Sequence, residues 1–199
     1  MSVLLSVMSR TKEFDEAEVL DRALELFRAR GFKHTSFSDL TGELGVNRQS
    51  LYDTYGDKQT LFLMALKRYT ERSVDRIRRK LDDSRPVRQD LRELFDGMID
   101  MNCEKGSPGC LMVNSMVEQA PHDPETRALA QAHARAMERL FADRLKAAQD
   151  KGEIAPEKDV VALAHFLLHT MLGLSVASRA FGRREDLRQS AELALQALG

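Results

Sequence analysis

Long runs of helix-forming residues, separated by short breaks that contain glycine or proline, limit most strongly how this chain can fold. The 199 residues include only five prolines. Ala, Leu, Glu, Arg and Lys, which favour helices, dominate the stretches between the breaks. Apolar residues recur there at helical spacing, as at Leu20, Ala23, Leu24 and Phe27. The sequence therefore predicts an all-α protein.

Three short helices are predicted near the N-terminus. The first covers about residues 15–30, and Gly31 stands where a helix terminator belongs. Ser36 can cap the second helix and Asn47 the third, with Gly45 in the turn between them. The second and third helices therefore match a helix-turn-helix arrangement.

Longer helices are predicted for the rest of the chain. Proline- or glycine-containing breaks separate them, at residues 84–86, 106–109, 121–124 and 152–156. We expect a flexible N-terminal arm over residues 1–13, a helix-turn-helix domain over 14–60, and a larger helical domain over 61–199.

Charge and hydropathy narrow the possible partners. The formal net charge is -1 at pH 7, and residues 1–70 contain equal numbers of basic and acidic side chains. Any nucleic-acid binding must therefore depend on local placement of basic groups. The apolar stretch 160–178 is nearly long enough to cross a membrane, but it contains His165 and His169, which are costly in lipid. We expect it to be a buried helix of a cytoplasmic protein with no membrane partner.

The third predicted helix lies within VNRQSLYDTYG, residues 46–56, and carries mainly polar side chains. Leu51 is its strongly apolar residue and is expected to anchor it. Arg48 can bind guanine or phosphate, and Gln49 can read adenine, so an exposed first turn with both suits a major groove. Hydroxyl and ammonium groups can donate to phosphate oxygens, namely those of Ser50, Tyr52, Tyr55 and Lys58. A polar surface helix with two half-buried tyrosines is an equally good reading of the composition alone.

The segment TSFSDLTGELGVNRQSLYDTYGDKQTLF, residues 35–62, resembles the DNA-binding region of the tetracycline-repressor (TetR) family of bacterial regulators. The shared features are the Thr-Ser opening, the Gly-Val turn, Leu-Tyr, the aromatic residue before Gly, and the Lys followed by Leu-Phe. The resemblance covers about the first third of the chain. It implies a homodimer in which each third helix meets half of a double-stranded operator, while the larger domain dimerises and encloses an effector pocket.

The resemblance also implies roles for single residues. Phosphate contacts fall on Thr35, Ser50, Tyr52, Tyr55 and Lys58, and sequence preference on Asn47, Arg48 and Gln49, with Ser36 included in the DNA-binding set. Many family members have a strongly basic arm before the first helix, whereas only Arg10 and Lys12 stand there in this sequence. The implied function is transcriptional regulation, with a repressor released from its operator by a small-molecule or reactive effector. No enzymatic activity, metal or cofactor is expected.

The larger domain offers weaker signals, of which the segment EKGSPGCLMVNSMVEQAPHD, residues 104–123, is the most suggestive. Cys110 is expected in the first turn of a helix, where it is either a reactive thiol or a small apolar residue of a pocket wall. The methionines either line an adaptable cavity or belong to the core. The candidate effector pocket comprises Met101, Cys110, Met112, Asn114, Met116, His133, His165 and His169.

Two alternatives to a regulator are open. His165 and His169 stand four residues apart, a spacing that can hold a metal, so the chain could be a helical metal- or ligand-binding protein that uses them with Cys110. No further ligands accompany the pair, and histidines of this kind more often satisfy buried hydrogen bonds. A helical dimer that only mediates protein contacts is the other alternative.

Dimerisation is predicted to use the helix over residues 160–178 with the last helix. Gly173, Ser175 and Ala177 are small enough to allow close approach of two helices. The leucines of this stretch provide more apolar area than one protomer needs, and a two-fold interface would cover the surplus.

Overall fold

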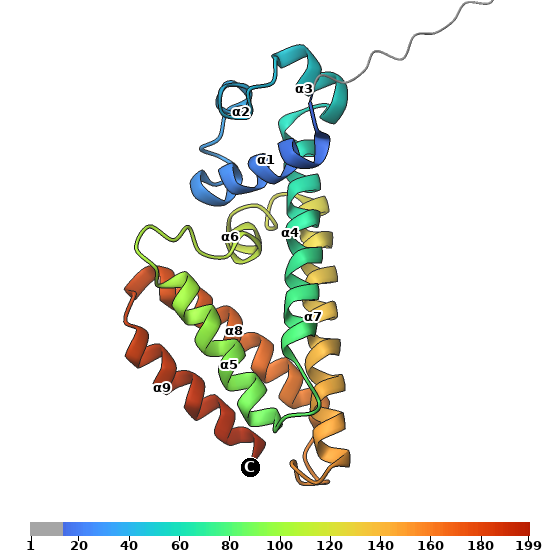
Figure 1. The fold of residues 1–199 in the computed structure, drawn as a ribbon, viewed down its shortest axis with the longest axis vertical. Coiled ribbons are helices and arrows are strands. Elements are labelled where there is room, and N and C mark those ends of the chain that lie inside the picture. Colours follow the sequence, from blue (N-terminus) through green and yellow to red (C-terminus); the bar gives the residue numbers. More distant parts are fainter. Residues whose placement is uncertain (1–13) are drawn as a thin grey trace, which may run out of the picture.

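The computed structural model describes residues 14–199, and the predicted arm over residues 1–13 lies outside this range. The described chain consists of helices joined by turns, which confirms the all-α prediction. In order they are α1 (Glu16–Arg30), α2 (Phe37–Leu44), α3 (Arg48–Tyr55), α4 (Lys58–Lys80), α5 (Val87–Asn102), α6 (Leu111–Glu118), α7 (Pro124–Asp150), α8 (Val160–Phe181), α9 (Arg184–Leu195) and a 3-10 turn, Gln196–Leu198. Helices α1–α3 gather at one end of the long α4, α5–α7 contact its remaining length, and α8 and α9 pack against α5 (Figure 1).

Local hydrogen bonds fix where the short helices begin and end. Ser36 and Asp39 form a reciprocal capping box at the start of α2. The side-chain oxygen of Asn47 accepts a hydrogen bond from the backbone N–H of Ser50 at 2.8 Å at the start of α3. Gly45, with φ of 68°, adopts the left-handed conformation that ends α2. These caps and turns are the ones predicted from the sequence.

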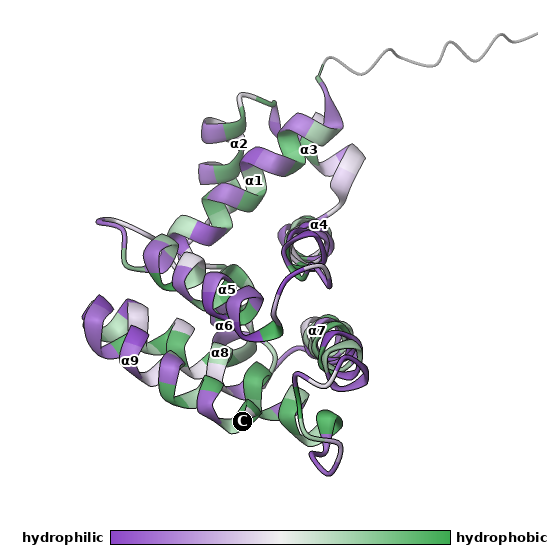
Figure 2. Cartoon of the chain, turned by 60° about the horizontal axis from the view of Figure 1, so that its bottom comes forward, coloured by the Kyte–Doolittle hydropathy of each residue, from purple (hydrophilic) through white to green (hydrophobic). Residues whose placement is uncertain are grey.

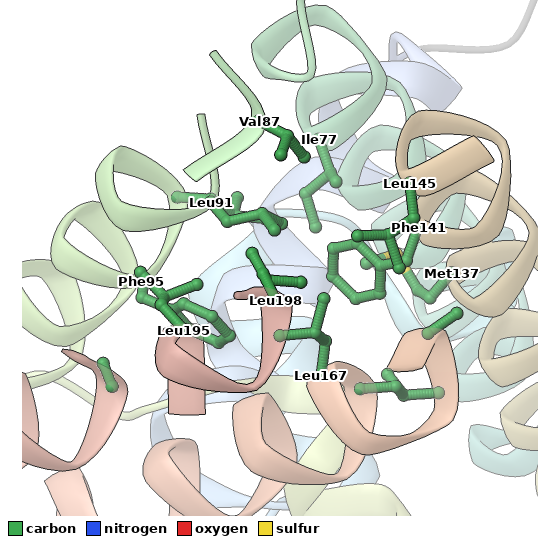
Figure 3. Packing of buried hydrophobic residues seen from close by; sticks show 14 of the residues in the cluster. Ile77, Val87, Leu91, Phe95, Met137, Phe141, Leu145, Leu167, Leu195 and Leu198 are labelled. Carbon is green, nitrogen blue, oxygen red and sulfur yellow. The ribbon is translucent and has the colours of Figure 1, made fainter. Parts of the chain in front are cut away.

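Buried apolar side chains form two clusters. The head cluster joins α1–α3 and the first part of α4, through Leu66, to parts of α6 and α7, and it contains Leu51, the predicted anchor of α3. The body cluster joins α5, α7, α8 and α9 to the end of α4. Figure 3 shows part of this cluster, with Phe95 beside Leu195 and Phe141 beside Leu145. We call α1–α3 the head and α5–α9 the body, with α4 shared by both. Because the head cluster includes Leu66, its packing extends beyond residue 60, the boundary that we predicted.

Helix α8 is apolar along its length but only partly covered (Figure 2). Among residues 14–199 it is the one helix long and apolar enough to cross a membrane by length and composition. Only 28% of its most apolar 18-residue stretch is buried. Leu167 packs into the body cluster, whereas Val161, Phe166, Val176 and Phe181 are exposed. The predicted burial of this helix is therefore only partly right, since one side packs within the chain and the other faces outward.

Candidate DNA interface and effector cavity

The outer face of α3 presents the side chains expected to read DNA. Arg48 and Gln49 are exposed, and 60% of Tyr52 is exposed. The Arg48 guanidinium lies 5.3 Å from the centre of the Phe37 ring, a cation–π contact that orients it without burying it. The Gln49 amide donates a hydrogen bond to Asp53 at 2.7 Å. These groups stand at the end of the molecule farthest from the body (Figure 1).

Two further predicted DNA-binding residues serve first as helix caps. The Ser36 hydroxyl donates to the Asp39 carboxylate at 2.6 Å, and Asn47 uses its side-chain oxygen to cap α3. Both side chains lie on the surface, and Ser50 is half-buried beside the Asn47 cap. The cap uses the side-chain oxygen of Asn47, so the two N–H donors of the same amide are not needed for it.

Three residues predicted to contact phosphate have their polar groups turned inward. Thr35 is fully buried, and its hydroxyl donates to the carbonyl at the end of α1. Tyr55 is 3% exposed and donates to the Glu16 carbonyl at 2.8 Å, while burial raises the pKa of Tyr55 to about 12. Lys58 donates to the Phe32 carbonyl at 3.1 Å. In this structure these three side chains hold the head together, and their assignment to phosphate contact stays a prediction.

An ion cluster fastens the head to α4. Asp21 of α1 accepts hydrogen bonds from Arg68 at 2.6 Å and 2.9 Å, and from Arg72 at 2.9 Å. The hydrogen bond from Arg68 is the largest of the effects that hold the pKa of Asp21 well below its usual range. The two-pronged Arg68 contact fixes the angle between α1 and α4.

A cavity of about 200 Å3 opens between α4, α5, α6, α7 and α8. Its wall is mainly apolar and includes the methionines Met98, Met101, Met112, Met116 and Met171. Flexible thioether side chains suit a site that adapts to its ligand. Five of the candidate pocket residues meet at this wall, namely Met101, Cys110, Met112, Met116 and His133.

The other three candidate pocket residues lie outside this cavity. Asn114 donates its side-chain amide to the Pro108 carbonyl at 3.2 Å, in the turn before α6. His165 and His169 are exposed on α8, with His165 Nε2 4.0 Å from a Glu138 carboxylate oxygen. Their inclusion in the pocket is therefore corrected, because the two histidines lie on the outer face of α8 and Asn114 of α6 is bound to the turn at Pro108.

Cys110 contributes its thiol to the cavity wall. It is the N-cap residue of α6, one position before the first turn in which we expected it, and it is half-buried. The Tyr69 hydroxyl donates to Cys110 Sγ at 3.3 Å. Burial, and then the neighbouring Cys110, raises the pKa of Tyr69, so the phenol keeps its proton at neutral pH. Cys103 and Cys110 are both free thiols.

His133 supplies a neutral hydrogen-bonding group. Its Nδ1 is buried and has no hydrogen-bond partner among residues 14–199. Burial lowers the pKa of His133 to about 4, so the imidazole is uncharged at pH 7. An unpaired buried nitrogen is costly unless a ligand or water satisfies it.

Basic side chains from outside the body also line the cavity, and the sequence analysis assigned none of them to it. They are Arg28 of α1 and Arg76 and Lys80 of α4. Arg28 Nε donates to the Gly109 carbonyl at 3.0 Å, directly before Cys110. A residue of the head is therefore hydrogen-bonded to the turn that begins α6 and is part of the cavity wall.

Comparison with known proteins identifies the family from both parts of the chain. A model described as "Bacterial regulatory proteins, tetR family" matches residues 19–65, and "Tetracyclin repressor-like, C-terminal domain" matches residues 87–194. The chain belongs to the TetR family.

Related TetR-family proteins are similar over almost the whole chain. YezE of Bacillus subtilis, an uncharacterized HTH-type transcriptional regulator, is 36% identical over 96% of this chain and 100% of its own length. ComR of Escherichia coli, an HTH-type transcriptional repressor, is 30% identical over 94% of this chain and 90% of its own. A cysteine mutant of the regulator CifR, solved with 26-base-pair operator DNA, is 30% identical, with a TM-score of 0.84 and coverage of 96% and 100%.

The chain is therefore a DNA-binding transcriptional regulator of the TetR family. Its relatives are regulators, and the alternative based on His165, His169 and Cys110 gains no support from the geometry. The two histidines lie on the outer face of α8, whereas Cys110 lies in the cavity wall. Within residues 14–199, no three His, Cys, Asp or Glu side chains gather in a way that could hold a metal ion.

Proposed function

We propose that this protein is a cytoplasmic homodimeric repressor, released from its operator when a small effector occupies the cavity between α4 and α8. The observation that carries the proposal is the position of Arg28. It belongs to the head, yet it lines the cavity and is hydrogen-bonded to Gly109. Filling the cavity therefore acts on a side chain that moves with the DNA-binding helices.

On the DNA side, the proposal assigns base reading to the first turn of α3 and phosphate contact to its exposed hydroxyl groups. Arg48, Gln49 and Asn47 are the candidates for the major groove, and Tyr52 and Ser50 for the backbone. The operator complex of CifR, a relative with the same fold, supports DNA as the partner.

Dimerisation is proposed to occur through the exposed side of α8 together with α9. Val161, Phe166, Val176 and Phe181 of α8 are exposed apolar side chains, and Leu193 of α9 is 65% exposed. A second copy of the chain is the occupant that fits best, because a two-fold contact covers the same apolar surface on both protomers. Two recognition helices held in one dimer can then meet successive major grooves, about 34 Å apart.

The experiment that tests the repressor proposal is fluorescence anisotropy on DNA from the protein's own upstream region, across a salt series. We expect tight binding that weakens steeply as salt rises, because phosphate contacts release counterions. The variant Arg48→Ala with Tyr52→Phe should lose the preference for this DNA. Arg79→Ala, which removes an exposed charge of α4 away from the head, is the matched control. Absence of specific binding at every salt concentration would refute a repressor that acts on this upstream region.

A thiol-modifying reagent added to the same assay separates two kinds of effector. Release of DNA by the reagent, absent in Cys110→Ser, identifies a covalent effector that acts at the cavity thiol. Unchanged DNA binding after complete modification of Cys110 leaves a reversible ligand as the effector.

The dimer proposal is tested with Phe166→Glu, which places a charge in the exposed apolar side of α8. We expect a monomer in sedimentation velocity and a large loss of operator affinity, because only one recognition helix remains per particle. Val117→Glu is the matched control, since Val117 is 68% exposed on α6 and lies outside the α8–α9 surface. A Phe166→Glu protein that stays dimeric would exclude this face.

A further inference from the structure

The charged side chains that line the cavity all carry the same sign. Arg28, Arg76 and Lys80 are basic, and the lining residues include no Asp or Glu. Arg28 is partly compensated, since its Nη1 lies 3.5 Å from a Glu25 oxygen. Arg76 has no salt bridge or hydrogen bond with any residue in the range 14–199. A ligand in this cavity therefore meets a positive field from one wall.

Arg76 and Lys80 act from the same face of α4. They are four residues apart and therefore lie one above the other, at the exposed edge of the cavity. Hydrogen bonds from Gln89 and Arg85, and to a smaller extent the charge of Lys80, lower the pKa of Glu93. Glu93 forms its salt bridge with Arg85, at 2.8 Å, and not with Lys80. Two basic groups at the mouth are thus left with unused hydrogen-bonding capacity.

Gly97 of α5 makes room for one of these groups. A Cβ atom at position 97 would lie 3.1 Å from Lys80 Nζ. The absence of a side chain therefore lets the ammonium group lie against α5 at the edge of the cavity. Any larger residue would displace the ammonium from this position.

Behind this basic edge, the cavity favours a compact and polarizable apolar group. Five methionines line it, and thioether sulfur makes favourable contacts with aromatic rings. The volume of about 200 Å3 compares with about 150 Å3 for a cavity that binds benzene. One ring with a short substituent fits this space.

We infer that the ligand of this cavity is an aromatic carboxylate, with its ring among the methionines and its carboxylate at Arg76 and Lys80. An arginine fork can bind both carboxylate oxygens, and the lysine ammonium adds a third donor. The acid is also the charge state that the wall selects, because an amine would be repelled by all three cations. The inference rests on the proposed function for its regulatory meaning, but the binding can be measured without DNA.

The experiment uses three probes with one skeleton, namely 3-phenylpropanoate, 3-phenylpropanamide and 3-phenylpropylamine. Isothermal titration of the full-length protein should show the acid binding at least about tenfold more tightly than the amide, and no binding of the amine. The double variant Arg76→Gln, Lys80→Gln should reduce affinity for the acid about tenfold and leave that for the amide unchanged. Arg79→Gln, a neighbouring exposed arginine that does not line the cavity, should alter neither.

Several results would overturn the inference. They are equal binding of acid and amide, binding of the amine, no binding of any probe at millimolar concentration, or an unchanged affinity for the acid in the double variant. Operator release is measured separately. An acid that binds but leaves DNA bound refutes the effector role and keeps the ligand class, whereas release by a neutral or cationic ligand alone refutes the ligand class and keeps the effector role.

Discussion

The head and the body position their functional side chains in different ways. In the head, residues three or four positions apart set the geometry, as in the Ser36–Asp39 capping box and the Asn47 cap on α3. The cavity, by contrast, is assembled from side chains as distant in sequence as Arg28 of the head and Ser175 of the body. Local chemistry therefore specifies the DNA-reading surface, whereas the ligand site exists only once distant helices have packed.

The largest expected effect tests whether the head is a separate unit. Leu51→Ala removes the fully buried anchor of α3 and should cost about 3–5 kcal/mol of unfolding free energy. Hydrogen exchange should show lost protection in α1–α3 and in α6, because Leu111 and Met112 belong to the head cluster. Helices α8 and α9 should keep theirs, and Met64→Ala, at a 41% exposed position, should change little. Equal loss of protection throughout would show that the two clusters unfold as one.

The next effect concerns the body and depends on pH. The pKa of His133 is about 4 in the folded chain and about 6.5 when unfolded. The unfolded state therefore binds more protons between these values. The contribution of neutral His133 to the free energy of unfolding is fully present above pH 6.5 and falls as pH decreases through 4, by about 3 kcal/mol in total. Denaturant unfolding at several pH values should show this loss in the wild-type protein and not in His133→Leu. His122→Leu, at an exposed histidine, should keep it, and parallel curves for wild type and His133→Leu would contradict the prediction.

A smaller effect addresses the reading surface alone. Arg48→Ala should weaken operator binding about 10- to 100-fold, the value of a lost base contact. Because Arg48 is exposed, the free energy of unfolding and the binding of 3-phenylpropanoate should stay as in the wild type. Loss of ligand binding in this variant would show that the two regions are not as separable as their packing indicates.

The smallest effect tests the local origin of α3. Asn47→Ala removes the cap hydrogen bond to Ser50 and should cost about 1 kcal/mol. Asn47→Ser keeps a capping oxygen and should restore most of the stability. If neither variant changes the unfolding midpoint, then packing of Leu51, and not the cap, fixes where α3 begins.

This contrast also explains which predictions from the sequence succeed. Helix ends in the head follow from caps and glycines, so α3 lies within the predicted segment 46–56 and begins directly after its predicted cap, Asn47. The hydrogen-bond partners of side chains are harder to predict from the sequence. Tyr55 donates to the distant Glu16 carbonyl, and Lys58 donates to the Phe32 carbonyl. No local sequence pattern indicates that a polar group will form a hydrogen bond with a residue of another element.

Part of the cavity wall could be predicted from the sequence, but its basic side chains could not. The methionines, Cys110 and His133 could be selected by residue type, but Arg76 and Lys80 lie on a helix whose cavity-facing side is defined only by the packing of α5–α8. Similarly, apolar composition marks α8 but does not distinguish surface covered within one chain from surface left exposed on the protomer, which is why His165 and His169 were misplaced.

The Arg28 side chain in the cavity wall has a thermodynamic consequence. If a ligand at Arg76 and Lys80 lowers operator affinity by some factor, then operator DNA must lower the affinity for that ligand by the same factor. Protein molecules that are free of DNA then have the higher affinity for the ligand, so they bind it at lower ligand concentration than DNA-bound molecules do. A surplus of free protein over operators would thus buffer the ligand, delaying derepression and sharpening its onset as ligand concentration rises.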